Sequence, residues 1–292
     1  MNSHIPTLLL REWMQHKRGW LIAAFAPPLI ALALVLFANP RMDGDHGSAP
    51  PLELIALMMT VLSGCVVYVI CLLLALFQLP GLARRDTQDR SIEFWLSLPG
   101  RPSESVAATV LAHAWLAPLG GAVVGALFGL PFVLTAFGMH LGWGKAFGLP
   151  WGEIVAAAAP MLARGLAGTV LLTLWLAPLI LVLMAASAWL KRLGVPLVLV
   201  GCAVAITVMH KAYGIDWPLE ALMDLNQRIN HSLLYDAHEL MNTLKSDANL
   251  WVAMTHDLAR SLAELASVQF LGWAVVAAAG FALVVMKRAR GG

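Results

Sequence analysis

The feature that most constrains the fold is a series of apolar runs, most of them long enough to cross a bilayer. A helix needs about 20 mainly apolar residues for one crossing. The sequence predicts six transmembrane helices within a single domain, residues 1–292. Their approximate ranges are 20–38, 54–79, 106–137, 154–190, 195–210 and 267–286. The fifth run is short, but without it the C-terminus would change sides of the membrane.

Composition supports the same fold class. Hydrophobic residues make up 60% of the chain and charged residues only 12%, whereas a soluble domain carries about 25% charged residues. We therefore predict an all-α, polytopic membrane protein. In the third run, Gly121 and Gly125 have the G-x-x-x-G spacing that permits close helix packing. The cysteines are odd in number and lie in apolar runs, so we expect buried hydrophobic side chains rather than disulfides.

Lysine and arginine predict the orientation, because cytoplasmic loops carry an excess of them. With the N-terminus in the cytoplasm, 12 of the 19 basic residues lie inside and six outside, whereas 12 of the 17 acidic residues lie outside. The inside residues are Arg11, Lys17, Arg18, Arg84, Arg85, Arg90, Arg101, Lys191, Arg192, Lys287, Arg288 and Arg290. We expect both termini in the cytoplasm.

Residues 4–18, before the first span, predict an N-terminal interfacial helix lying along the headgroups. One face of this helix is apolar: Leu9, Leu10, Trp13 and Met14. The remaining face is basic: Arg11, Lys17 and Arg18. This helix either only fixes the topology or also docks a partner, and both roles stay open.

A small helical extracytoplasmic segment is predicted at residues 211–265, between the fifth and sixth spans. Its first helix would begin at Asp216 or at the Trp217-Pro218 pair, and residues 248–265 form a second amphipathic stretch. The segment contains His231, His238 and His256, spread over 26 residues beside acidic side chains. That spacing is unlike the short ligand spacing of metal sites, so we expect solvated helix faces and no metal.

Arg164 is the charged residue that the predicted spans would bury. A charge inside the bilayer is by default a hypothesis for a functional site. The alternative, which the excess length of residues 154–190 favours, is that the helix bends after Pro160 and Arg164 reaches the headgroups along its own stem.

The chain carries no nucleotide site of its own, because nothing in it fits the P-loop pattern G-x-x-x-x-G-K-[ST]. Nor does it contain G-x-S-x-G or Cys-x-x-Cys. We therefore expect no enzymatic activity from this chain and no cofactor bound by it.

The only sizeable cytoplasmic loop, residues 80–105, contains the stretch DRSIEFWLSLPGRPSES. Asp89 or Ser91 can cap a short helix, and the Pro99-Gly100 pair ends it. Aromatic side chains beside arginine are typical of interface anchors. The short helix therefore lies either on the membrane or against a soluble partner.

This stretch resembles the D-R-S-I-x-F-W-x-S-L-P sequence of bacterial permease subunits of type 2 ABC exporters. The matching residues are Asp89, Arg90, Ser91, Ile92, Phe94, Trp95, Ser97, Leu98 and Pro99. The six-span plan and the N-terminal helix extend the resemblance over the chain, whereas the long segment at 211–265 departs from a simple member. The resemblance implies a location in the bacterial cytoplasmic (inner) membrane.

In that family the loop forms a coupling helix that docks on a separate ATPase subunit. The resemblance therefore implies ATPase coupling by Asp89 to Trp95, Glu93 included, with Leu98 and Pro99. It also implies a connecting helix containing Arg11, Glu12, Trp13, Lys17 and Arg18. The implied partners are a soluble ATPase that binds ATP and Mg²⁺, a second permease chain (the same or different) and membrane lipids, with no nucleic acid.

The substrate of such an exporter stays open. Two other classes also stay open: a membrane-embedded enzyme that uses the extracytoplasmic helices, and a structural or regulatory membrane protein that transports nothing. Stoichiometric metal at His231 and His238 would favour the enzyme.

Overall fold

The structure is a computed structural model that describes residues 4–37, 51–84, 101–246 and 248–290. The all-α prediction is confirmed, since the described residues form helices, turns and short connections without a strand. The long helices are α1 (Ile5–Phe37), α2 (Leu52–Leu82), α6 (Ala117–Leu141), α8 (Trp151–Leu190), α9 (Gly194–Tyr213) and α13 (Val268–Ala289). The shorter ones are α5 (Pro102–Val110), α7 (Trp143–Phe147), α10 (Trp217–Leu233), α11 (Ala237–Lys245) and α12 (Leu250–Ala263).

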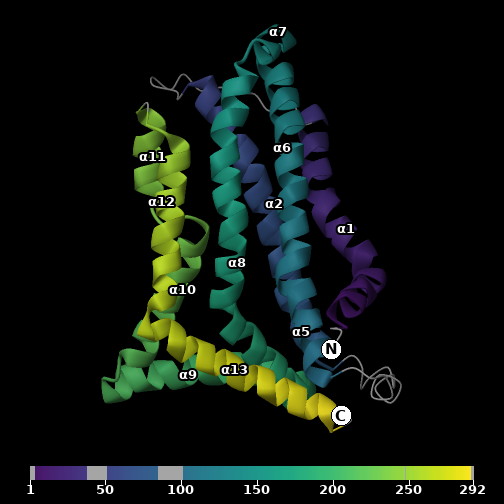
Figure 1. The fold of residues 1–292 in the computed structure, drawn as a ribbon, viewed down its shortest axis with the longest axis vertical. Coiled ribbons are helices and arrows are strands. Elements are labelled where there is room, and N and C mark those ends of the chain that lie inside the picture. Colours follow the sequence, from purple (N-terminus) through teal and green to yellow (C-terminus); the bar gives the residue numbers. More distant parts are fainter. Residues whose placement is uncertain (1–3, 38–50, 85–100, 247, 291–292) are drawn as a thin grey trace.

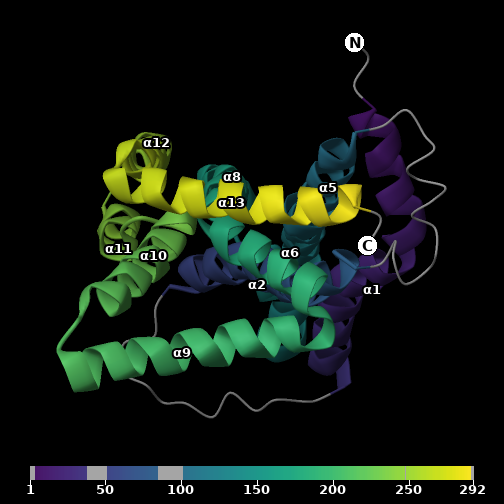
Figure 2. The ribbon, with the colours of Figure 1, turned by 90° about the horizontal axis from the view of Figure 1, so that it is seen from below.

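The long helices are arranged in two directions. Helices α1, α2, α6 and α8 run along the long axis of the molecule, whereas α9 and α13 lie across one end (Figure 1). The view from below shows α9 and α13 lengthwise (Figure 2). Helices α10, α11 and α12 rise beside α8. The start of α1 and the end of α13 lie at the same end of the molecule, as an orientation with both termini on one side requires.

The number of candidate membrane spans among the described residues differs from the prediction. Five stretches of the described chain are long and apolar enough to cross a membrane: Ile5–Phe37, Leu52–Leu82, Pro102–Leu141, Trp151–Tyr213 and Val268–Ala289. The predicted number was six, and it differs because Trp151–Tyr213 contains both the fourth and the fifth predicted span.

The turn between those two spans explains the direction of α9. A 3₁₀ turn at Lys191–Leu193 separates α8 from α9, and Lys191 adopts a positive φ of 57°. Gly194 packs so closely that a Cβ there would overlap the carbonyl oxygen of Ala186. Helix α9 therefore leaves α8 at a sharp angle.

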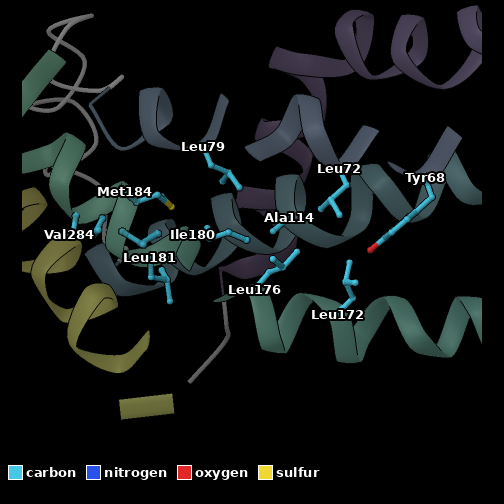
Figure 3. Close-up of a cluster of buried hydrophobic side chains, with 12 residues drawn as sticks. Tyr68, Leu72, Leu79, Ala114, Leu172, Leu176, Ile180, Leu181, Met184 and Val284 are labelled. Carbon is cyan, nitrogen blue, oxygen red and sulfur yellow. The ribbon is translucent and has the colours of Figure 1, made fainter. Parts of the chain in front are cut away.

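The main apolar core joins α2, α8 and α13 near the end where α13 crosses. Leu79, Met184, Leu181 and Val284 are buried there, and their side chains converge in Figure 3. Helix α13 crosses α8 closely, because a Cβ on Gly280 would lie 2.9 Å from the carbonyl carbon of Leu181. Burial of such side chains stabilises a helix contact through dense packing.

Helices α2 and α6 meet along a row of glycines. A Cβ on Gly125 would lie 2.6 Å from the carbonyl oxygen of Ser63, and a Cβ on Gly129 would lie 2.7 Å from that of Thr60. The Ser63 hydroxyl donates to the Gly125 carbonyl at 2.8 Å. The predicted close approach at Gly125 is therefore confirmed.

Candidate functional site

The predicted coupling residues lie outside the described residues. They are Asp89, Arg90, Ser91, Ile92, Glu93, Phe94, Trp95, Leu98 and Pro99. The next described residue is Arg101, which directly precedes α5, and Pro102 occupies the first turn of that helix. Proline suits that position because its missing N–H has no helical partner there. The chain that follows the predicted coupling helix therefore enters the third membrane stretch directly.

The predicted interfacial helix is not a separate element, because residues 5–37 form one continuous helix. Arg11, which the prediction places on the basic outer face, is only 7% exposed, and its neighbour Glu12 is fully buried. Trp13, on the predicted apolar face, is 44% exposed. Lys17 and Arg18 are exposed, as expected. The charged pair faces the protein because it finds partners there.

Those partners belong to α5. Arg11 Nη2 donates to Glu12 Oε1 at 2.6 Å and to Ser105 Oγ at 3.4 Å. The Thr109 hydroxyl donates to the same Glu12 oxygen at 3.0 Å. A buried charge needs such partners, because an unpaired one costs several kcal/mol. Helix α1 is thus fastened by polar contacts to the first two turns of the third membrane stretch.

The Arg164 side chain lies inside the protein, between α8 and α12, rather than at its surface. The residue is 3% exposed, and its Nε donates to Asp257 Oδ2 at 2.7 Å. Its Nη2 donates to Ser261 Oγ at 2.6 Å. Asp257 also accepts hydrogen bonds from the backbone N–H groups of Tyr235 and Asp236. A charge so fully paired is a structural link between α8 and the helices beside it.

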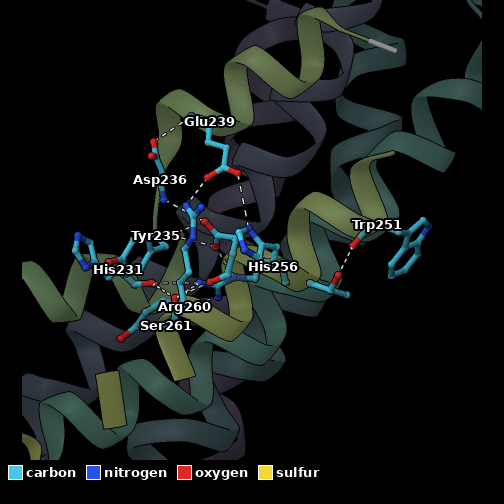
Figure 4. A network of polar contacts seen from close by, with 12 residues as sticks. His231, Tyr235, Asp236, Glu239, Trp251, His256, Arg260 and Ser261 are labelled. Carbon is cyan, nitrogen blue, oxygen red and sulfur yellow. Dashed lines mark hydrogen bonds and ion pairs between the residues drawn. The ribbon is translucent and has the colours of Figure 1, made fainter. Parts of the chain in front are cut away.

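Other polar side chains of α10, α11 and α12 lie near that link, as Figure 4 shows for His231, Glu239 and His256. His231 lies 2.9 Å from Glu264, and His256 lies 3.9 Å from Glu239. Asp236 caps α11 by accepting from the backbone N–H groups of His238 and Glu239. The backbone N–H of Glu239 holds the pKa of the Asp236 carboxyl below its usual value.

The structure brings together three potential metal ligands that sequence reasoning missed. Glu12, His16 and His113 offer ligand atoms within 4.8 Å of one another. Glu12 and His16 are four residues apart, a spacing that puts both on one helix face, so two of the three residues could have been found from the sequence. His113 was not, because only the packing of α1 against the third stretch brings it near.

An apolar pocket of about 250 Å³ lies between α1, α2 and α6. Pro27 and Pro28 line it from α1, Met59 and Ser63 from α2, and Phe132 from α6. The pocket lies where the two prolines interrupt the hydrogen bonds of α1. It suits an apolar group.

The described fold is that of a helical membrane protein. Heme exporter protein B of Pseudomonas aeruginosa is 32% identical to the chain over 114 residues, which cover 39% of this chain and 47% of that protein. The match thus spans about half the length of this curated relative. No protein-family model matches the chain, and no solved structure matches it.

Proposed function

We propose that the chain is the transmembrane permease subunit of an ABC exporter in the bacterial cytoplasmic membrane. It supports export of a substrate with energy from a separate ATPase subunit. Three findings support this function: the apolar helices, the similarity to a heme exporter protein, and the coupling-like stretch at residues 89–99. The sequence lacks a P-loop, so the ATPase must be another chain.

The observation that carries the proposal is the fastening of α1 to α5. The buried Arg11–Glu12 pair binds Ser105 and Thr109, which follow the predicted coupling stretch within a few residues. A push on that stretch would therefore move α5 and α1 together, because separating the two helices would take the hydrogen bonds of Ser105 and Thr109 away from two buried charged groups. This contact supports the proposal that the N-terminal part of α1 acts as a connecting helix.

In the proposed cycle two permease chains pair, and each binds one ATPase chain. ATP and Mg²⁺ close the ATPases, the coupling helices move, and the spans rock to open an outward path. Exposed apolar side chains on α1 and α9, such as Ile22 and Val200, provide surface for lipid and for the second permease chain. Heme is the first cargo to test, because the relative is named as a heme exporter protein.

Co-purification tests the ATPase partner. The chain is extracted from its own cells in mild detergent, and the P-loop ATPase that accompanies it is quantified. Truncating an aromatic hot spot costs about 2 kcal/mol or more, which is roughly a 30-fold weaker association. We expect this loss in a Phe94→Ala, Trp95→Ala double variant.

The matched control is Trp143→Ala with Phe147→Ala, an exposed and stacked aromatic pair on α7, at the end of the molecule opposite to α5. This variant should retain the ATPase. Full retention by the Phe94→Ala, Trp95→Ala variant would show that the coupling role is wrong.

A further inference from the structure

His113 is a buried titratable residue that the proposed transport cycle does not use. Its side chain is fully buried, and neither ring nitrogen has a hydrogen-bond partner among the residues that the structure describes. Its Nε2 atom nevertheless lies 3.4 Å from Glu12 Oε2. Buried polar groups are normally satisfied, so this imidazole is placed as if for a ligand at Nε2.

His16 approaches the same oxygen from α1. Its Nδ1 atom lies 3.7 Å from Glu12 Oε2 and 3.2 Å from the backbone carbonyl oxygen of Glu12, a contact that a metal ion at Nδ1 would replace. The ring meets that of His113 edge to face with centroids 4.6 Å apart. Trp20 packs on His113 from the next turn, at 5.0 Å between centroids. One carboxylate oxygen and two imidazoles therefore surround a single point, under an aromatic cover.

The surrounding residues orient the carboxylate for this arrangement. Arg11 and Thr109 both donate to Glu12 Oε1, which directs Oε2 toward the two imidazoles. Hydrogen-bond donors that orient a ligating side chain without contacting the ion are typical of metal sites. Arg11 also places a positive charge beside the carboxylate, at 2.6 Å from Glu12 Oε1.

The local backbone is irregular at His113. Residues Leu111–Leu116 form one π-helical turn between α5 and α6. Pro118 follows it, and because proline has no N–H it cannot donate to the carbonyl four residues earlier, that of Ala114. The Thr173 hydroxyl donates to that carbonyl at 3.5 Å. Single π turns inside α-helices are frequent at functional sites.

We propose that Glu12, His16 and His113 form a binding site for one divalent transition-metal ion of the zinc class. Ligand atoms about 2.0–2.1 Å from a tetrahedral ion stand roughly 3.3 Å apart, and the distances of 3.4 and 3.7 Å to Glu12 Oε2 come close to this. Two imidazoles and a carboxylate suit zinc and its neighbours, whereas calcium and magnesium prefer oxygen ligands alone.

The bound ion would join α1 to the π turn of the third membrane stretch. Three protein ligands leave one tetrahedral position for water or another ligand. Because the ion would add to the Arg11–Thr109 fastening, its occupancy would stiffen the junction between α1 and the third stretch. The site itself does not depend on the transport function.

Metal binding tests the proposal directly. The full chain, purified in detergent with a tag that lacks histidine, is stripped with chelator and titrated with Zn²⁺ by calorimetry and with Co²⁺ by visible absorption. We expect one ion per chain and the absorption of tetrahedral Co²⁺. His113→Ala and His16→Ala should each weaken Zn²⁺ binding at least tenfold. Thr109→Val, which acts through Glu12, should weaken it by about tenfold.

The control is His238→Ala, which removes an exposed histidine of α11 and should leave the affinity unchanged. Binding of less than one Zn²⁺ per folded wild-type chain would show that His113 serves aromatic packing only. Loss of binding in His238→Ala, with retention in His113→Ala, would place the metal on residues 211–265 instead. If His113→Ala fails to fold, His16→Ala and Thr109→Val decide between the two sites.

Discussion

Replacing Arg164 by methionine should detach α10–α12 from α8. The guanidinium donates to Asp257, to Ser261 and to the carbonyl oxygens of Ser232 and His231. Methionine keeps much of the side-chain length but none of these donors. Asp257, 5% exposed, would keep only backbone donors for its charge.

The size of the effect follows from burial. Removing one partner of a buried ion pair costs about 3–5 kcal/mol, which corresponds to an opening equilibrium larger by roughly 10²- to 4 × 10³-fold. Hydrogen exchange of residues 217–263, measured by mass spectrometry in detergent, reports this local opening. We expect faster exchange there and little change in α2 and α6.

Arg260 gives the matched control. It pairs with Glu239, and its side chain is 38% exposed. A surface pair of this kind contributes about 0–1 kcal/mol, so Arg260→Met should change exchange only slightly. If Arg164→Met and Arg260→Met exchanged alike, the buried pair would not hold the segment in place.

Two further predictions concern helix contacts and pH. Gly125→Ala should lower the free energy of unfolding by about 1–3 kcal/mol through overpacking against Ser63, which is measured as a lower melting temperature. Gly120→Ala should not lower it, because a Cβ at Gly120 meets open space. Equal effects of the two substitutions would refute the close approach. Because the folded-state pKa of Asp236 is lowered by the Glu239 N–H, its cap on α11 is fully present above about pH 4 and is lost as the pH falls through the lowered pKa. Exchange of residues 237–245, corrected for intrinsic rates, should rise there, and Asp236→Asn, which caps without titrating, should remove this pH dependence.

The apolar runs predicted the helices well, because a bilayer demands long hydrophobic segments and leaves few alternatives. Helix α10 begins at Trp217 and α12 at Leu250, close to the predicted starts, since proline and asparagine mark helix starts by local chemistry. The turn at Lys191 that sends α9 across the end depends on packing around Gly194, which carries no local signal.

The polar contacts could not be predicted in the same way. Arg164 and Asp257 are 93 positions apart, and Glu12 and Thr109 are 97 apart. Hydrophobic periodicity tells which face of a helix is apolar, but it does not tell which distant charge will meet another. The amphipathic pattern of residues 4–18 misplaced Arg11 for this reason: beside Glu12, it finds buried partners that outweigh its preference for water.

The central claim, that a soluble ATPase drives this chain through residues 89–99, is tested most directly by photocrosslinking in living cells. A photoreactive benzoylphenylalanine replaces Trp95 in one variant. In another it replaces Trp143 of α7, which lies at the end of the molecule opposite to α5. The account predicts that position 95 forms an adduct with a chain that contains a P-loop, and that position 143 does not. Contradiction would come from position 95 linking only to lipid, or from both positions giving the same adducts.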